Sequence, residues 1–248
     1  MGYNARFWYP KRGGIEQLAM SFINDIEHVH LNSEITAIDI ANREITIASA
    51  AKERFDCLIS TLPLPELPNL VKGLPQEVAE AFKKLRWNSI FNLNLGVNAS
   101  DKSGKHWIYF PEKEIIFFRA GFYNNFSSDI APRNATSLYA EVSYPKDKMI
   151  NTKDITAQIK ENLKKAGILN RRSEIVLEDA NDIKYGYPIC DINYNSARAE
   201  IIRYLSGNGI FTCGRYGSWR YMSMEDVILD GKIVADKLSK KNELGGKI

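Results

Sequence analysis

Residues 209–217 combine the residue types best suited to binding a ligand. They form a short apolar run that is followed by Gly214, Arg215 and a second glycine. The run predicts a buried strand that ends in a tight turn. A glycine turn next to an arginine could approach an anionic ligand closely. The alternative hypothesis is that the turn serves packing only and binds no ligand.

A helix is predicted to begin directly after this turn. Ser223 is a favourable N-cap, and Asp226 stands three residues later, where it can complete a capping box. The first unpaired N–H groups of the helix would belong to Met224 and Glu225. Such a helix start offers backbone donors and a positive dipole end, which favour an anionic or electron-rich ligand atom.

Arg119 lies inside the apolar residues 115–122. Burying an unpaired guanidinium is costly, so it requires a carboxylate or an anionic ligand. Glu141, in the strand-like run 138–142, is an available partner. The sequence slightly favours a structural Arg119–Glu141 pair, and an arginine that faces a bound anion is the alternative.

Tyr109, Tyr187 and Tyr221 each stand next to turn residues. Tyrosines in such places are usually packing residues with a hydrated hydroxyl, so each one alone indicates little. Other chemistries find no support: the histidines do not have metal-ligand spacing, and no GxSxG is present. The near match to GxGxxG at residues 207–212 precedes a strand and ends in threonine, which excludes it as a dinucleotide fingerprint.

The composition is that of a globular protein, with 44% hydrophobic and 25% charged residues and a net charge of +3. No basic cluster indicates nucleic acid, and no apolar run indicates a membrane span. Three cysteines that lie far apart predict a reducing, cytoplasmic setting. Cys57 and Cys213 lie in apolar runs and are predicted to be small core residues.

The hydrophobic periodicity predicts an α+β fold. Helices are expected at residues 15–26, 76–85, 154–166, 194–204 and 223–238. Strands are expected at residues 90–97, 107–110, 115–122, 137–142, 175–187 and 209–213. Residues 63–75 contain four prolines and are predicted to form an irregular loop.

Four segments together resemble the superfamily of flavin amine oxidases, protoporphyrinogen oxidases and UDP-galactopyranose mutases. Residues 9–18 read YPKRGGIEQL, and residues 56–63 read DCLISTLP. Residues 107–112 read WIYFPE, followed by FRA at 118–120, and residues 214–221 read GRYGSWRY. The resemblance covers nearly the whole chain, and the segment 214–221 is its most specific part.

The resemblance implies FAD as the cofactor and a small-molecule substrate. It places Ile35 at the adenine end, Thr61 along the cofactor, and Gly214, Arg215, Met224 and Glu225 at the flavin ring. In the mutases, the residues that match Tyr109, Arg119, Tyr187, Arg215 and Tyr221 contact a sugar nucleotide, chiefly its diphosphate. That role agrees with the chemistry of a guanidinium.

The resemblance also implies a division of the chain. Residues 1–87 and 189–248 would be the residual half of an FAD-binding domain, and residues 88–188 would be a largely antiparallel substrate domain with helices. The superfamily's GxGxxG segment has no counterpart in this sequence, so we expect the chain to be a C-terminal portion. An exposed sheet edge would then favour self-association or a partner that carries the Rossmann half.

Three functional hypotheses remain open. The first is the C-terminal part of an FAD-dependent oxidoreductase, incomplete for catalysis alone. The second is a flavin-dependent isomerase similar to UDP-galactopyranose mutase, although residues 222–226 are shorter than the mutase segment. The third is a non-catalytic partner subunit of a separately encoded Rossmann half.

Overall fold

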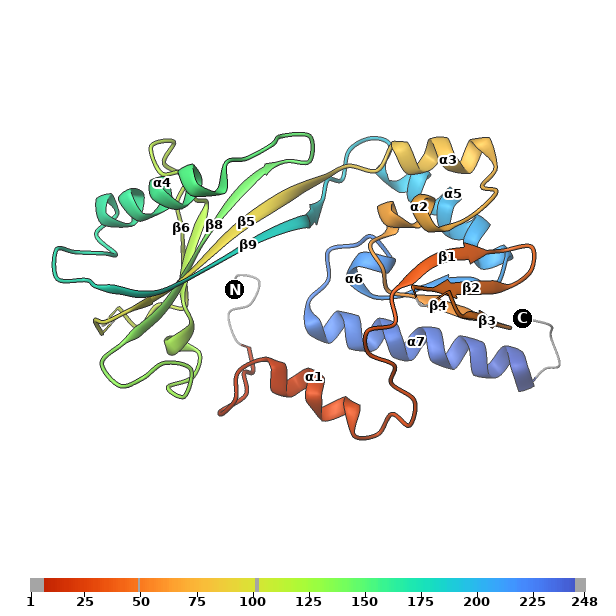
Figure 1. Cartoon of the computed structure of the whole chain (residues 1–248), viewed down its shortest axis with the longest axis horizontal. Helices are drawn as coiled ribbons and strands as arrows, with labels where there is room; N and C mark the ends of the chain where they lie inside the picture. The colour runs from red at the N-terminus through yellow and green to blue at the C-terminus, as the bar shows by residue number, and fades with distance from the viewer. Residues whose placement is uncertain (1–6, 49, 101–102, 244–248) are drawn as a thin grey trace. The chain divides into compact units, whose positions relative to one another are not determined.

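The computed structural model describes residues 7–48, 50–100 and 103–243 of the chain, without the side chains of residues 241–243. The chain forms two compact units. The sheet unit comprises Met1–Val29 and Asn88–Gly186, and the turn unit comprises His30–Trp87 and Tyr187–Ile248. The described residues 7–29 therefore cluster with the sheet unit, whereas the sequence analysis grouped them with residues 30–87. Figure 1 shows the elements of each unit.

The sheet unit is built on a five-stranded sheet of order β6-β7-β8-β5-β9. Its pairs β5–β8, β7–β8 and β6–β7 are antiparallel. The strands are β5 (Trp87–Val97), β6 (Trp107–Tyr109), β7 (Arg119–Phe122), β8 (Thr136–Pro145) and β9 (Ile175–Pro188). The unit also contains α1 (Glu16–Ile23), the short η2 (Tyr123–Asn125) and α4 (Thr152–Lys165), which begins at the N-cap Asn151.

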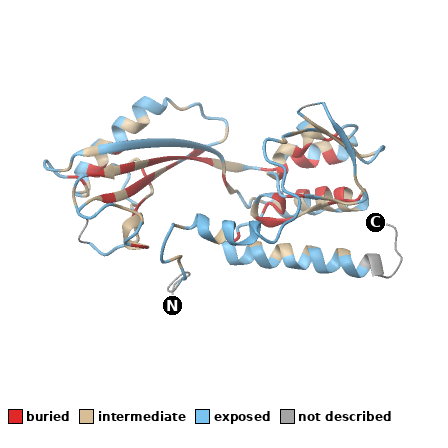
Figure 2. Ribbon diagram, turned by 60° about the horizontal axis from the view of Figure 1, so that its bottom comes forward, coloured by how far each residue is buried: buried red, intermediate tan, exposed pale blue. Residues whose placement is uncertain are grey.

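Alternate side chains of the central strands separate an apolar from a polar face. Phe91 and Leu93 of β5, with Ala140 of β8, are fully buried in one cluster with Ile159 and Leu163 of α4. The intervening residues on β5 and β8 include asparagine, tyrosine and glutamate. Figure 2 shows the buried residues concentrated along these strands. The period of two thus directs one face to α4 and leaves polar groups on the other.

Two sequence predictions for the sheet unit need correction. The strand expected at residues 115–122 is confined to β7, residues 119–122. The N–H of Ile115 donates to the carbonyl of Glu112 in a turn, and the N–H of Ile116 donates to the side chain of Asn162 on α4 at 2.7 Å. The helix expected at residues 15–26 is the shorter α1, and it has no buried residue.

The turn unit contains two small sheets. Strands β1 (Ile35–Asp39), β2 (Glu44–Ile47) and β3 (Lys52–Arg54) are antiparallel, whereas β4 (Leu58–Ser60) and β10 (Ile210–Thr212) are parallel. The longer helices are α3 (Gln76–Lys83), α5 (Tyr194–Gly207) and α7 (Met224–Glu243), and α6 (Gly214–Gly217) is one turn long. The mixture of helices and largely antiparallel sheets confirms the predicted α+β class.

The proline-rich residues 63–75 were predicted to form an irregular loop, and this prediction is wrong in part. They form η1 (Leu64–Glu66) and α2 (Leu67–Leu70). Each of these short helices has its proline at one of the first two positions, where the missing N–H costs no hydrogen bond. Cys213 is buried as expected, but Cys57 is partly exposed. No helix in the described part of the chain is long and apolar enough to cross a membrane.

Candidate functional site

The glycine turn, residues 214–221, follows β10 as the sequence predicted. Gly214 adopts a φ of 75°, which glycine tolerates without steric cost. A Cβ on Gly217 would lie 2.5 Å from the carbonyl oxygen of Ser60, so only glycine fits against the end of β4. Backbone bonds from Ser218 to Gly214 and from Arg220 to Arg215 close the turn. The turn therefore carries Arg215 on a tightly packed backbone.

Arg215 packs against tyrosine rings of the same unit. Its Cζ lies 5.0 Å from the ring centroid of Tyr187 and 4.8 Å from that of Tyr221. The two rings lie 5.9 Å apart at an angle of 26°. Arg215 also donates from Nη1 to the carbonyl of Met222 at 3.4 Å. Both ring distances are within cation–π range, so the rings orient the guanidinium.

Helix α7 begins next to this cluster in the sequence, and its start is capped as predicted. The hydroxyl of Ser223 accepts from the N–H of Asp226 at 3.2 Å, and the Asp226 carboxylate accepts from the N–H of Ser223 at 2.8 Å. The carboxylate also accepts from the hydroxyl of Ser223, and the bonds that it accepts from the N–H and the hydroxyl of Ser223 lower the pKa of Asp226. Met224 and Glu225 are exposed in the first turn, where backbone N–H groups have no partner within the helix. This helix start can donate to an electron-rich atom.

The other two residues predicted to bind the cofactor lie on β1 and after β4. Ile35 begins β1, is partly buried and pairs with Ile47 of β2. Thr61 is exposed and directly follows Ser60, which is 6% exposed. The hydroxyl of Ser60 is buried and has no hydrogen-bond partner among the described residues. The end of β4 therefore offers polar groups beside the closely packed Gly217.

In the sheet unit, Arg119 pairs with Glu141. The two residues face each other across β7 and β8, and Nε and Nη2 of Arg119 both lie 2.5 Å from Oε2 of Glu141. The side chains are 22% and 13% exposed. The structural pair that the sequence favoured is confirmed. The Arg119 Cζ also lies 5.9 Å from the ring centroid of Tyr109, which is 59% exposed.

The buried Tyr139 and the half-buried Tyr123 lie near this ion pair. The ring of Tyr139 lies over Gly121, where a Cβ would come within 2.4 Å of it. The hydroxyl of Tyr123 donates to Asn94 at 3.3 Å. Burial raises the pKa of Tyr139, and burial, assisted by the charge of Glu141, raises the pKa of Tyr123 to about 12. Both phenols therefore stay protonated at neutral pH and can serve as hydrogen-bond donors.

The structure thus sorts the predicted residues into two groups. Tyr187, Arg215 and Tyr221 lie together in the turn unit, whereas Tyr109 and Arg119 lie together in the sheet unit. Metal chemistry finds no support in the described ranges, because no three His, Cys, Asp or Glu side chains gather there in a way that could hold an ion.

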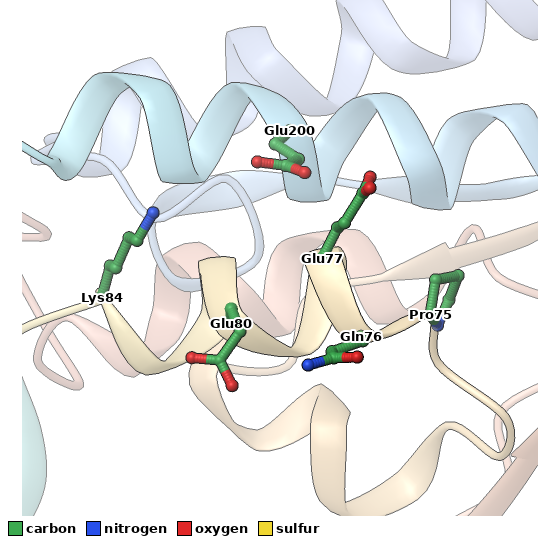
Figure 3. A pocket seen from close by; sticks show the side chains of 6 residues that line it. All are labelled: Pro75, Gln76, Glu77, Glu80, Lys84 and Glu200. Atoms are coloured by element: carbon green, nitrogen blue, oxygen red, sulfur yellow. The ribbon is translucent and has the colours of Figure 1, made fainter.

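A groove between α3 and α5 is a further surface feature of the turn unit. Its lining comprises Pro75, Gln76, Glu77, Glu80, Lys84 and Glu200. Figure 3 shows Glu77 and Lys84 extending towards α5, while Glu80 and Gln76 point away from it. The groove is shallow and mainly acidic, and it contains none of the residues that the sequence singled out. It is a solvated helix surface.

Residues 1–239 match the family described as flavin containing amine oxidoreductase. The chain belongs to this family. The match extends over both units, so the glycine turn and the Arg119–Glu141 pair both lie within it. The resemblance identified from the four sequence segments is therefore confirmed.

Solved structures with the same fold include proteins that are named for different activities. A reduced UDP-galactopyranose mutase is 26% identical, with a TM-score of 0.78 over 86% of this chain and 48% of that one. A protein assigned as a protoporphyrinogen oxidase from Exiguobacterium sp. 255-15 is 14% identical, with a TM-score of 0.73 over 92% and 51% of the two chains. The chain spans about half the length of these structures, and the second likeness concerns the fold alone.

The family implies FAD as the cofactor. The end of β4 suits a polar group of such a ligand, because the hydroxyl of Ser60 is buried without a partner among the described residues and Gly217 packs closely beside Ser60. The sequence contains no strand followed by GxGxxG, so the chain does not itself provide that seat for the pyrophosphate of a dinucleotide. The fit is thus to one end of the cofactor.

The sequence missed the side chains that hold the glycine turn. Asp230 of α7 bonds to Gly214 and Ser218, and Arg198 and Tyr194 of α5 bond to the carbonyls of Ser218 and Trp219. The sequence gave only a weak signal for these residues: Arg198 and Asp230 are charged and stand beside apolar residues in predicted helices. Which backbone groups they reach depends on how the two helices pack.

Proposed function

We propose that the chain is the C-terminal part of an FAD-dependent oxidoreductase and that it presents an anion-binding arginine next to the flavin-facing helix start. The observation that carries the proposal is the position of Arg215 on the tightly packed glycine turn. Its guanidinium lies against the rings of Tyr187 and Tyr221. Family membership supports the flavin chemistry. The cofactor, when bound, supplies the acceptor for a hydride from the substrate.

Each residue of the turn unit has a defined part in this proposal. The guanidinium of Arg215 binds an anionic group with parallel N–H donors, and the tyrosine rings keep it oriented. The N–H groups of Met224 and Glu225, at the positive end of the α7 dipole, donate to an electron-rich atom of the flavin ring. Thr61 lies along the cofactor, and Ile35 lies at its adenine end.

A flavin-dependent isomerase that acts on a sugar nucleotide is the second candidate. It is supported by the 26% identity to a UDP-galactopyranose mutase and by the arginine–tyrosine cluster, which suits a diphosphate. Tyr109 and Arg119 of the sheet unit match residues that contact the sugar nucleotide in the mutases, and here Glu141 holds Arg119 in place.

A non-catalytic partner role is the third candidate, because the chain spans about half the length of its structural neighbours. Exposed apolar side chains support a partner or a second copy: Ile59 on β4, and Ile228, Leu229 and Ile233 on α7. Light scattering of the purified chain over a range of concentrations tests this. A strictly monomeric chain at high concentration contradicts self-association.

The flavin part of the proposal is tested by a visible absorption spectrum. The purified chain is measured alone and after incubation with FAD and desalting. A flavin band near one equivalent shows that the residues of this chain suffice to retain the cofactor, and turnover is then assayed with amines and sugar nucleotides. Absence of a retained band contradicts FAD binding by this chain alone and favours the partner role.

The anion site is tested separately by calorimetric titration with inorganic pyrophosphate. We expect Arg215→Ala to weaken binding by about a hundredfold, the loss typical of a charge-assisted pair. Arg203→Ala is the matched control, because Arg203 is an exposed arginine on α5 of the same unit. Equal affinities in Arg215→Ala and the native chain contradict the proposed site.

A further inference from the structure

The glycine turn is held in place by side chains from the two helices that flank it in the turn unit. The Oδ2 atom of Asp230 on α7 accepts from the N–H of Gly214 at 2.8 Å and from the hydroxyl of Ser218 at 3.2 Å. One carboxylate oxygen thus joins the residue that begins α6 to the residue that follows it. Arg215 lies between these two attachment points.

Helix α5 holds the second half of the turn. Arg198 donates from Nε to the carbonyl of Ser218 at 2.5 Å, and the hydroxyl of Tyr194 donates to the carbonyl of Trp219. Burial raises the pKa of Tyr194, so its phenol keeps the proton that it donates. Both acceptors are main-chain carbonyls, and they lie on either side of the Trp219 α-carbon.

Trp219 is the residue that requires such support. Its φ is 50°, a left-handed conformation that costs a bulky residue energy and persists only where the surroundings fix it. Its side chain is 1% exposed and packs edge-on against Trp87, with ring centroids 6.0 Å apart. Trp219 lies between Arg215 and Tyr221 in the chain, so its conformation affects where the second ring lies against the guanidinium, 4.8 Å from its Cζ.

We infer that Asp230, Arg198 and Tyr194 are positioning residues that hold the glycine turn in the shape in which Arg215 is offered to an anion. They act through the turn, since each bonds to its backbone or to Ser218. The inference rests on the proposed anion site and extends it to two helices. It also accounts for a half-buried arginine and a carboxylate that the proposed chemistry itself does not use.

The test compares variants of the full chain in calorimetric titrations with inorganic pyrophosphate. We expect Asp230→Ala to weaken binding by about tenfold, because both ends of α6 lose their common acceptor. Asp230→Asn retains an acceptor oxygen and restores most of the affinity. Asp236→Ala is the matched control, since Asp236 is exposed on the same helix and pairs with Lys232 at 3.0 Å. Tyr194→Phe, which removes one donor, has a smaller effect.

A second measurement does not depend on the ligand. Arg215 and Arg220 are both in the turn, so trypsin cleavage at these residues reports how often the turn opens. We expect cleavage about tenfold faster in Asp230→Ala than in Asp236→Ala. Faster cleavage together with weaker pyrophosphate binding supports the inference.

The outcomes separate the inference from the proposed function. If Asp230→Ala binds pyrophosphate as the native chain does while Arg215→Ala does not, the anion site stands and the positioning role is overturned. If the native chain does not bind pyrophosphate, the proposed anion site fails. In that case, equal tryptic cleavage of Asp230→Ala and Asp236→Ala also overturns the positioning role, and faster cleavage of Asp230→Ala supports it.

Discussion

Arg119 and Arg215 belong to different units, and the comparison between them shows how a protein can fix the same side chain for different purposes. Arg119 is held by a carboxylate, with both contacts to Glu141 at 2.5 Å. Arg215 is held by tyrosine rings at 5.0 and 4.8 Å and by a carbonyl. A carboxylate neutralises the guanidinium, whereas ring faces orient it through a weaker electrostatic attraction.

The largest expected effect comes from removing the partner of Arg119. Glu141→Ala leaves a largely buried guanidinium without its carboxylate, and we expect the free energy of unfolding to fall by about 3 kcal/mol. Urea denaturation measures the change. Glu161→Ala, in an exposed pair with Lys164 on α4, should cost at most about 0.5 kcal/mol. Similar losses in the two variants would show that Arg119 does not depend on Glu141.

The corresponding change in the turn unit should affect binding more than folding. Tyr221→Ala removes one ring from Arg215, and we expect pyrophosphate affinity to fall by about tenfold while the unfolding free energy changes by less than about 1 kcal/mol. Tyr221→Phe keeps the ring and should bind almost as the native chain does. A binding loss in Tyr221→Phe equal to that in Tyr221→Ala would assign the role to the hydroxyl instead of the ring face.

The start of α7 is stabilised locally, unlike the long-range Arg119–Glu141 pair. Ser223→Ala removes the acceptor for the N–H of Asp226, and we expect a loss of about 1 kcal/mol in urea denaturation. Ser239→Ala, at an exposed position of the same helix, should leave stability almost unchanged. Equal results for the two serines would mean that the capping box contributes nothing measurable.

The smallest effect concerns the tyrosines around the ion pair of the sheet unit. The pKa of Tyr123 is raised to about 12, above the ordinary value of about 10, so the folded state favours the neutral phenol. This contribution is complete below about pH 10 and is lost as the pH rises towards 12. Tyr123→Phe should therefore lose stability less steeply between about pH 10 and 11.5 in unfolding titrations. Parallel curves for the two proteins would contradict a raised pKa.

Much of the fold could be predicted because its signals are local. The period-two pattern at residues 90–97 and 137–142 predicted the central strands, and Ser223 with Asp226 predicted the start of α7. Residues 115–117 misled because they are apolar but are held by Asn162 and the core beneath α4 rather than by a neighbouring strand. Short-range patterns do not report such long-range contacts.

The sequence by itself determined the α+β class, the glycine turn with its helix start, and the family to which the chain belongs. Backbone preferences and residue order decide these features, and both are written in neighbouring positions. Only the tertiary structure decided between Glu141 and a bound anion as the partner of Arg119, and showed that Arg215 lies against Tyr187 and Tyr221 and that Asp230 joins Gly214 to Ser218. These contacts join residues that are distant along the chain or depend on how helices pack, and a side chain's charge gives its need for a partner without naming that partner.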